Sequence, residues 1–360
     1  MNLHLVGGFL GSGKTTAIIG TAKYLMARGK RVGVVTNDQG KYLVDTAFFR
    51  LSDVPTVEVA GGCFCCNYDD LEARLGQLIA DTSADVVFAE SVGSCADMVA
   101  TVLKPLLQLR DATVRPTSFS VFADVRLLRR RLFGLPMPFS DTVSYIFDQQ
   151  IEEAGLLVLN KADLLPPESA REVEALARER FPGKSLRIQN SLSSQDVAGW
   201  VDLLESAAIP LPGRSLDIDY ERYGDGEAQL AWLDEEVALD AAPGMARAAV
   251  VRLIGAVIGA MAARQIPIGH LKMLIRWDSG ESNLSFTALD EKEWQQEIPA
   301  ITGRRVTLLI NARVEAQTAV LRQVLKQAVD GVVADGLAGA AESNVALFHP
   351  RRPRPTHRIR

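Results

Sequence analysis

Residues 8–15 read Gly-Phe-Leu-Gly-Ser-Gly-Lys-Thr, and this stretch decides the fold of the first half of the chain. Its three glycines let the backbone wrap an anion without the clashes that a Cβ atom would cause. An apolar run at residues 3–6 precedes the stretch, and a helix candidate at residues 15–28 follows it. Because a phosphate-binding loop joins a strand to the N-terminus of a helix, this context predicts one here.

The loop also predicts how phosphates and a magnesium ion would be held. We expect Lys14 to reach the β- and γ-phosphates, Thr15 to ligate Mg²⁺ through its hydroxyl, and Thr16 to bond the α-phosphate. Backbone N–H groups of the loop supply further donors. The expected phosphate contacts are Gly8, Gly11, Ser12, Gly13, Lys14, Thr15 and Thr16.

Short apolar runs alternate with longer amphipathic stretches up to residue 205. The runs are rich in Val, Leu and Phe, which suits strands of a parallel sheet buried on both faces. With helix candidates such as residues 15–28 and 69–80 between them, the alternation predicts a doubly wound α/β domain with a mainly parallel sheet. The runs are residues 3–6, 32–35, 56–59, 86–89, 119–123, 156–159 and 186–188.

A second domain is expected after residue 205, where the alternation of apolar runs and amphipathic stretches gives way to Pro/Gly-rich sequence. Residues 206–226 hold two Pro/Gly-rich stretches and are expected to be a linker. Residues 227–335 predict a small α+β domain, and residues 336–360 are expected to be a tail, with a solvated terminus or an anchoring strap both open. The expected strands are residues 230–239, 271–277, 283–288 and 306–314, and the expected helices are residues 245–263 and 317–329.

Two acidic motifs follow strands near the phosphate loop. Glu90 ends one apolar run, where it could hold Mg²⁺ through water or orient the attacking water. Gly93 follows three residues later and could give its N–H to the γ-phosphate. We therefore expect Lys14, Glu90 and Gly93 to be the catalytic residues. Asp38, after another run, is a candidate contact to Mg²⁺ or to a second metal, although such a segment is also a common turn.

The segment Asn160-Lys161-Ala162-Asp163 predicts which base is bound. A carboxylate can accept two hydrogen bonds from the N1–H and N2–H₂ groups of guanine, and adenine offers no such pair of donors. Asp163 is therefore expected to select guanine, Lys161 to stack along the base, and Asn160 to hold the loop and the base. The nucleotide is predicted to be GTP, with Ser191 as a further candidate contact to the base edge.

Three of the four cysteines, Cys63, Cys65 and Cys66, lie within four residues. They follow the apolar run 56–59 and should therefore share the sheet edge of the phosphate site. Thiolates suit Zn²⁺ and related soft ions, and the spacing differs from the separated pairs of a structural zinc finger. An open metal site is predicted, and a redox-active or buried thiol cluster is the alternative. Cys95 either completes the site or is a small buried hydrophobic residue.

Composition limits the classes of partner. The net charge is −5, with 39 basic and 44 acidic residues, so no overall basic field favours nucleic acid. The longest apolar run, residues 253–263, is too short to span a bilayer, and residues 1–6 lack the basic region of a signal peptide. We therefore expect a cytoplasmic protein with no membrane partner.

Together these motifs resemble the CobW-like GTPases, relatives of the nickel-insertion GTPases of urease and hydrogenase maturation. The resemblance covers about residues 1–205 and rests on the phosphate loop, residues 37–40, the Cys-x-Cys-Cys element, Glu90–Gly93 and Asn160–Asp163. Two features depart from the family. Lys41 stands where an acidic residue is usual, which removes one candidate metal ligand, and the histidine-rich stretch that such proteins often carry is missing.

The resemblance implies slow GTP hydrolysis coupled to the binding and delivery of Zn²⁺, Co²⁺ or a similar ion. By position, Lys14 and Thr15 would hold phosphate and Mg²⁺, and the three clustered cysteines would hold the delivered metal. The expected partner is a client metalloenzyme, with a homodimer as one assembly to test. The alternative is a GTPase that loads, activates or protects a cobalamin-dependent enzyme or corrinoid protein.

Overall fold

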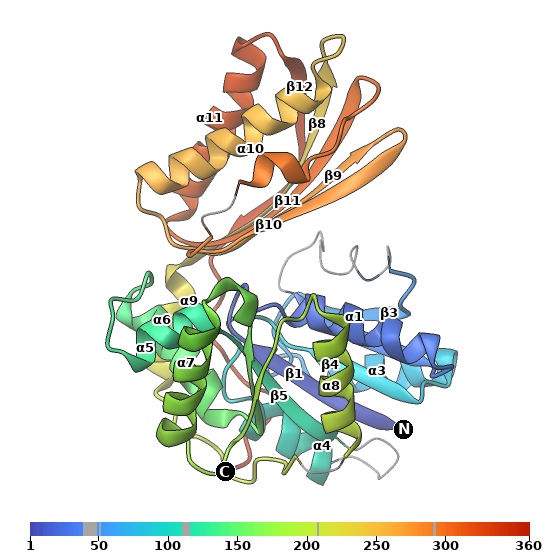
Figure 1. The fold of residues 1–360 in the computed structure, drawn as a ribbon, viewed down its shortest axis with the longest axis vertical. Coiled ribbons are helices and arrows are strands. Elements are labelled where there is room, and N and C mark those ends of the chain that lie inside the picture. Colours follow the sequence, from blue (N-terminus) through green and yellow to red (C-terminus); the bar gives the residue numbers. More distant parts are fainter. Residues whose placement is uncertain (39–48, 50–51, 110–115, 207–208, 291–292) are drawn as a thin grey trace. The chain divides into compact units, whose positions relative to one another are not determined.

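The computed structural model describes residues 1–360 apart from 39–48, 50–51, 110–115, 207–208 and 291–292. The described part separates into two compact units (Figure 1). The first contains the described residues up to Gly226 together with Arg352–Arg360, and the second contains Glu227–Arg351. The chain therefore leaves the first unit, forms the second, and returns to the first with its last residues.

Seven parallel strands form the described sheet of the first unit, in the order β3-β2-β4-β1-β5-β6-β7. Every predicted apolar run lies in one of them, so the prediction of a mainly parallel sheet is confirmed. The strands are β1 Asn2–Gly8, β2 Val32–Asp38, β3 Thr56–Ala60, β4 Val86–Glu90, β5 Pro116–Asp124, β6 Leu156–Asn160 and β7 Ser185–Ile188.

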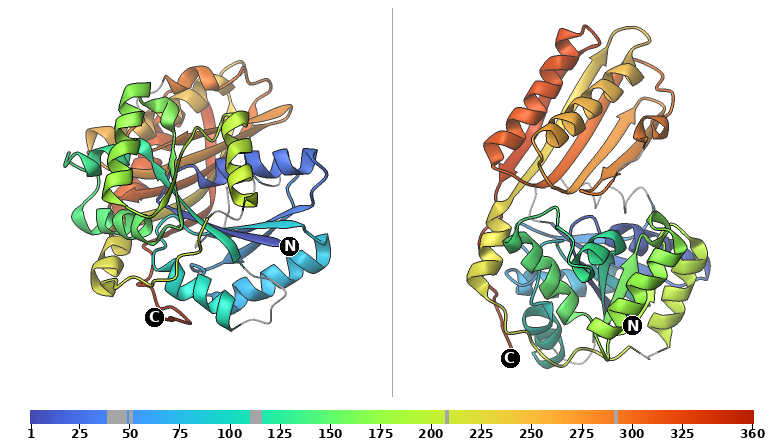
Figure 2. Two further views of the ribbon diagram at one scale, coloured as in Figure 1. Left: turned by 60° about the horizontal axis from the view of Figure 1, so that its bottom comes forward. Right: turned by 60° about the vertical axis from the view of Figure 1, so that its left-hand side comes forward.

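Helices cover both faces of this sheet (Figures 1 and 2). On β2, Val32 and Val34 belong to the apolar cluster that includes α1 and α8, whereas Gly33 lies against Leu78 of α3. Neighbouring residues of a strand point to opposite faces, so α3 covers the face opposite to α1 and α8. The helices are α1 Lys14–Ala27, α3 Tyr68–Thr82, α4 Lys104–Gln108, α5 Val125–Leu132, α6 Asp141–Glu153, α7 Pro167–Arg180, α8 Ser194–Glu205 and α9 Tyr220–Gln229, with short turns at Val99–Leu103 and Ala162–Leu164.

The second unit is an antiparallel sheet with two helices on one face (Figure 2). Its described strands lie in the order β10-β9-β11-β8-β12. The predicted α+β class is confirmed. The elements are β8 Leu230–Ala241, α10 Ala246–Ala263, β9 Ile268–Trp277, β10 Gly280–Phe286, a turn at Trp294–Glu297, β11 Arg305–Glu315, α11 Thr318–Ala334 and β12 Ala338–Phe348.

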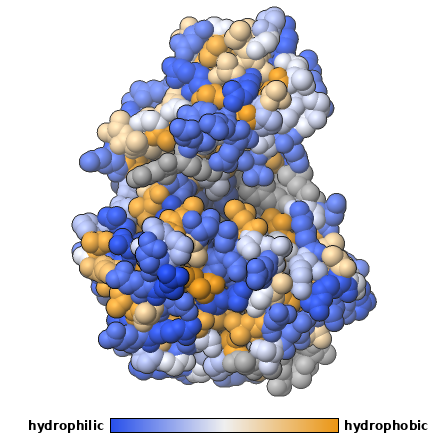
Figure 3. Space-filling view, viewed as in Figure 1, coloured by the Kyte–Doolittle hydropathy of each residue, from blue (hydrophilic) through white to orange (hydrophobic). Residues whose placement is uncertain are grey.

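Among the described helices, α10 is the one long and apolar enough to cross a membrane by length and composition. Its apolar character has another cause in this fold. Ala249, Leu253 and Val257 are fully buried in the core of the second unit. Spacings of four residues place these side chains on one stripe of the helix, which packs on the sheet. The face drawn in Figure 3 is mostly hydrophilic, with groups of hydrophobic residues among the hydrophilic ones.

Two sequence expectations were wrong. Residues 223–226, expected in a linker, lie within α9. The expected tail at residues 336–360 contains β12, which pairs with β8, and a final segment that packs on the first unit. Gly and Ala are uncommon in strands, so the sequence of β12 did not predict one. The strand forms because it pairs with β8, about a hundred residues earlier in the chain.

Candidate functional site

The phosphate loop connects β1 to α1, as the sequence predicted. Gly8 and Gly13 adopt φ values of 128° and 89°, which L-residues with a side chain rarely adopt. A Cβ atom at Gly8 would lie 2.2 Å from the Phe122 carbonyl oxygen, and one at Gly13 would lie 2.3 Å from the Asn160 amide nitrogen. Both positions therefore require glycine for the loop to curve closely over its neighbours. Gly11 also has a positive φ.

The polar side chains of the loop gather at the start of α1. Lys14 Nζ donates to the carbonyl oxygens of Gly8 and Phe9, at 2.7 and 3.2 Å. Thr15 Oγ1 donates to Glu90 Oε1 at 2.7 Å, and both residues are buried. Ser12 Oγ is buried and has no hydrogen-bond partner within the described chain. An ammonium group, a free hydroxyl and loop amides suit phosphate, and the oxygens of Thr15 and Glu90 suit Mg²⁺.

Glu90 is the last residue of β4, and Gly93 lies three residues beyond it. A Cβ atom at Gly93 would lie 3.0 Å from both N and Cα of Leu10, so Gly93 lies directly against the phosphate loop. Thr16 is exposed at the first turn of α1. The side chain of Asp38, the candidate Mg²⁺ contact, lies outside the described residues.

The segment expected to read the base is tied to the phosphate loop. Asn160 Nδ2 donates to the Ser12 carbonyl oxygen at 2.7 Å, and Asn160 Oδ1 accepts from Ser191 Oγ at 2.7 Å and from Ser191 N at 3.1 Å. Asp163 is exposed, as are Leu164, which follows it in the chain, and Leu192, which follows Ser191, at 47% and 79%. A carboxylate beside exposed apolar surface can both pair with and support a flat base.

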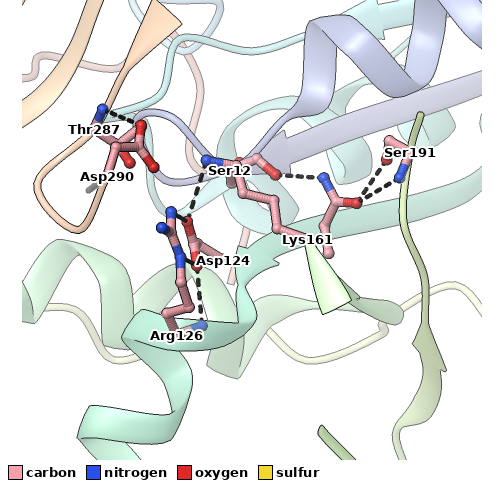
Figure 4. A network of polar contacts seen from close by, with 8 residues as sticks. Ser12, Asp124, Arg126, Lys161, Ser191, Thr287 and Asp290 are labelled. Carbon is pink, nitrogen blue, oxygen red and sulfur yellow. Dashed lines mark hydrogen bonds and ion pairs between the residues drawn. The ribbon is translucent and has the colours of Figure 1, made fainter. Parts of the chain in front are cut away.

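The sequence analysis missed the role of Asp124, at the end of β5 (Figure 4). Its carboxylate lies 2.7 Å from the Arg126 guanidinium and 3.2 Å from Lys161 Nζ. Burial alone would raise the pKa of Asp124, but the hydrogen bond from Arg126 and the charge of Lys161 lower it below its usual value. The charged carboxylate therefore orients Lys161. Its signal in the sequence was a single acidic residue ending an apolar run.

The three clustered thiols meet in a turn after β3. Cys63 Sγ lies 2.6 Å from Cys65 Sγ and 3.3 Å from Cys66 Sγ, and the Cys65 and Cys66 sulfurs are 3.7 Å apart. The turn is closed by hydrogen bonds from the amides of Cys66 and Asn67 to the Cys63 carbonyl oxygen. Sulfurs bound to one tetrahedral Zn²⁺ at about 2.3 Å lie about 3.8 Å apart. The Cys65–Cys66 separation is near that value, whereas the Cys63–Cys65 and Cys63–Cys66 separations are about 1.2 and 0.5 Å shorter. The Cys63 sulfur therefore has to move away from both neighbours to accommodate the ion.

The thiols share protons unequally. Hydrogen bonds with the thiols of Cys65, Cys66 and Cys95 hold the pKa of Cys63 well below its usual value. The same contact with Cys63 raises the pKa of Cys65, and raises that of Cys66 to about 11. Cys63 is therefore the thiol of the three that loses its proton most readily, and the thiolate is the form of cysteine that binds metal.

Asn37 joins the end of β2 to the cysteine turn, a role that the sequence analysis did not assign. Its Nδ2 donates to the carbonyl oxygens of Val59 and Gly62, at 3.0 and 2.7 Å. Its Oδ1 accepts from the amide of Phe64 at 2.8 Å. One buried side chain thus fixes the backbone on both sides of Cys63. The sequence signal was present, because Asn37 opens the predicted Asn-Asp-Gln-Gly segment.

Comparisons with known proteins agree with this geometry. A family model for the nucleotide-binding domain of CobW/HypB/UreG proteins matches residues 2–186. The chain is 29% identical over 175 residues to the zinc chaperone YeiR of Escherichia coli, covering 48% of this chain and 49% of YeiR. It is 24% identical over 254 residues to the zinc chaperone CobW of Pseudomonas aeruginosa, covering 60% of this chain and 64% of CobW. The chain thus spans about half to nearly two thirds of the length of these relatives.

Among solved structures, HypB from Helicobacter pylori in complex with nickel is similar at 15% identity and a TM-score of 0.42, covering 60% of this chain and 92% of HypB. The family model covers about half of the chain. The segment that it matches contains the phosphate loop, the cysteine turn and Asn160–Asp163, which follow strands of one parallel sheet. The resemblance inferred from the motifs is therefore confirmed, and the chain belongs to the CobW/HypB/UreG family of nucleotide-binding proteins.

Proposed function

We propose that this protein hydrolyses GTP and couples the nucleotide to the binding and delivery of zinc. The observation that carries the proposal is Asn37, whose amide ties β2 to the cysteine turn on both sides of Cys63. β2 is hydrogen-bonded to β4, which ends in Glu90 at the phosphate site. A shift of these strand ends with the nucleotide would therefore change the separation of the thiols.

The residues of the phosphate site have separate tasks in this proposal. Lys14 and the loop amides bind the β- and γ-phosphates, and the Thr15 hydroxyl and Glu90 hold the magnesium site. Bound Mg²⁺ supplies positive charge that offsets the charge of the phosphates. The amide of Gly93 approaches the γ-phosphate and so distinguishes GTP from GDP.

Guanine selection is assigned to the segment after β6. Asp163 accepts from the two donors on the guanine edge, and the exposed side chains of Leu164 and Leu192 support the ring. Asn160 bonds Ser12 and Ser191, which keeps this segment at a fixed distance from the phosphate loop.

Zinc is the favoured cargo for two reasons. Soft thiolates prefer Zn²⁺ to hard cations such as Mg²⁺, which separates the cysteine turn from the magnesium site chemically. Two curated relatives are also named zinc chaperones. The expected recipient is a client metalloprotein that takes the ion from the cysteine turn.

The test is the zinc affinity of the full chain, measured by chelator competition in the presence of a non-hydrolysable GTP analogue and of GDP. We expect the two zinc dissociation constants to differ about tenfold, a typical coupling between sites. The matching pair of adenine nucleotides serves as the control and should give equal zinc affinities. Equal affinities with the two guanine nucleotides would contradict coupling.

Hydrolysis is tested separately by phosphate release. We expect phosphate from GTP and little from ATP, with a turnover that changes when zinc is added. Equal release from the two nucleotides would contradict the guanine assignment and leave the metal site unaffected.

A further inference from the structure

A fourth thiol lies against the cysteine turn. Cys95 is 1% exposed, and its side chain is hydrogen-bonded to the sulfurs of both Cys63 and Cys65. Cys63, Cys65 and Cys66 place three sulfurs within 4.8 Å of one another, and the Cys95 sulfur lies farther than that from at least one of them. A closed tetrahedral zinc site takes four ligands, so Cys95 has to move closer to the cluster to complete it. We propose that Cys95 is the fourth ligand of the ion held by Cys63, Cys65 and Cys66. This inference rests on the zinc function proposed above.

The loop that carries Cys95 is held in place by its own hydrogen bonds. The Cys95 amide donates to the Val92 carbonyl oxygen at 3.0 Å. Gln150 Nε2, from α6, donates to the carbonyl oxygens of Gly93 and Cys95, at 3.0 and 2.8 Å. The Ala96 amide donates to the Tyr223 hydroxyl at 3.0 Å. These contacts fix the backbone on both sides of Cys95, so the thiol meets the cluster in a constrained position.

The loop that carries Cys95 also contacts the phosphate site, so the fourth ligand is linked to the nucleotide. Gly93, against the phosphate loop, is two residues away, and Glu90, bonded to Thr15, is five residues away. One short loop therefore contacts the phosphate site at its start and the cysteine cluster at its end. Movement of Gly93 toward a γ-phosphate displaces Cys95, which changes the number of sulfurs on the ion.

X-ray absorption at the zinc edge counts these sulfurs directly. Zinc-loaded full-length protein should show four sulfurs at about 2.3 Å, and Cys95→Ser should show three sulfurs and one lighter atom. The zinc dissociation constant of Cys95→Ser should rise at least about tenfold, since even ligand-supporting residues contribute that much. Ser94→Ala, in the same loop, is the control and should keep four sulfurs.

Three sulfurs in both the wild type and Cys95→Ser would overturn the fourth ligand and leave the zinc function standing. Failure of the wild type to retain one zinc per chain would overturn both.

A second observation concerns the last residues of the chain, Arg352–Arg360, which we call the C-terminal strap. The Arg354 amide donates to Cys66 Sγ at 3.2 Å. Thr356 follows the same turn, with its amide donating to the Cys65 carbonyl oxygen at 2.9 Å and its hydroxyl to the Cys66 carbonyl oxygen at 3.0 Å. The His357 ring packs edge-on against Tyr68, with centroids 5.1 Å apart. The strap thus lies directly on the cysteine turn.

The strap is anchored beyond the turn as well. Arg358 donates to Asp97 Oδ2 at 2.7 Å and to the Leu216 carbonyl oxygen at 2.9 Å. The Ile359 amide donates to the Ala100 carbonyl oxygen at 2.9 Å. Prolines on both sides of Arg354 restrict the backbone there and keep it extended. These anchors hold the Arg354 amide at the sulfur.

We infer that the C-terminal strap retains the metal ion. When Cys66 binds the ion it does so as a thiolate, and an N–H group that donates to this sulfur stabilises its charge and supports the ligand, as outer hydrogen bonds do in other metal sites. The strap also covers the turn, so it has to lift before a client can take the ion.

The test compares Arg354→Pro, which removes the N–H donor, with Arg354→Ala, which keeps it and removes an exposed side chain. Zinc release from the full chain to an excess of chelator should be about tenfold faster for Arg354→Pro and unchanged for Arg354→Ala. Thr356→Val removes the hydroxyl donor to the Cys66 carbonyl oxygen and should also release zinc faster. Wild-type release rates for both Arg354→Pro and Thr356→Val would overturn the retention role.

Discussion

Single polar side chains connect the functional loops of the first unit. Asn160 bonds the phosphate loop and Ser191, and Asn37 bonds both sides of the cysteine turn. Asp124 holds Lys161 by charge. Each of these side chains is buried, and breaking a buried polar contact costs more than an exposed one because its partner loses water as well. Substitutions at these three residues are therefore expected to lower activity more than substitutions at exposed neighbouring residues.

Asp163→Asn should weaken GTP binding about a hundredfold, because the amide loses one acceptor and presents a donor to the N–H groups of guanine. The measurement is the GTP dissociation constant by titration. Glu168→Gln, an exposed acid-to-amide change on the following helix, is the matched control and should bind GTP as the wild type does. Equal affinities of the two variants would refute the assignment of Asp163.

His4 predicts how the stability of the first unit depends on pH. Burial lowers the pKa of this imidazole to about 4, and its Nδ1 lies 2.8 Å from Ser118 Oγ. The folded state favours neutral His4, so its contribution is complete above the unfolded pKa of about 6.5 and is lost as the pH falls toward 4. The loss amounts to roughly 3 kcal/mol at the acidic end.

His4→Gln cannot titrate and should lose less stability than the wild type between pH 7 and pH 4.5. Thermal unfolding across this range measures the difference. Parallel curves for the two proteins would show that His4 is not the titrating group.

Among the elements, the carboxyl ends of β1, β3 and β4 carry the phosphate loop, the cysteine turn and the Glu90–Cys95 loop. Parallel pairing brings strand ends that are far apart in sequence to one edge of the sheet. β2 lies between β3 and β4 in this order and carries Asn37 at its end. The element best placed to relate nucleotide to metal is therefore the end of β2.

Asn37→Ala should lower zinc affinity about tenfold and reduce the difference between the GTP and GDP states, although it removes no thiol. The reason is that three backbone groups around Cys63 lose their partner. Chelator competition with each nucleotide gives both quantities. Asn283→Ala makes the same change at an exposed position of β10 and should match the wild type. Wild-type zinc affinity and nucleotide dependence in Asn37→Ala would remove the observation on which the proposed coupling rests.

At the scale of the whole molecule, the C-terminal strap packs on the first unit after the chain has formed the second. Arg358 pairs with Asp97, 261 residues earlier, so the stability of the first unit depends on a segment that follows the second unit in the chain. Asp97 is fully buried and also accepts from the Tyr220 hydroxyl at 2.7 Å. Removing the Arg358 cation would leave the Asp97 carboxylate buried and without its counter-charge, which lowers the free energy of unfolding. The hydrogen bond from the Tyr220 hydroxyl offsets part of this loss.

Arg358→Gln should destabilise the first unit by about 2 kcal/mol, which corresponds to a fall of roughly 4–8 °C in its melting temperature. Scanning calorimetry of the full chain measures this, and Arg360→Gln, at an exposed position, should leave the melting temperature unchanged. No shift for Arg358→Gln would mean that the anchor carries no stability.

Local sequence sufficed to predict the phosphate loop between β1 and α1, the seven parallel strands and the turn that brings three cysteines together. In each case the residues that act together are neighbours in the chain, so glycine spacing, apolar runs and ligand spacing were already visible. The elements of the second unit up to α11 followed from the same periodicity.

Tertiary structure decided what depends on distant partners. The pairing of β12 with β8, the contact of Cys95 with Cys63 and Cys65, and the return of Arg354 to Cys66 join segments separated by about 30 to 290 residues. No periodicity or spacing records such contacts, because loop closure over these lengths is decided by the packing of the whole sheet. The motif alone placed three sulfurs in a turn. The fold added a fourth sulfur beside two of them and a strap over the turn.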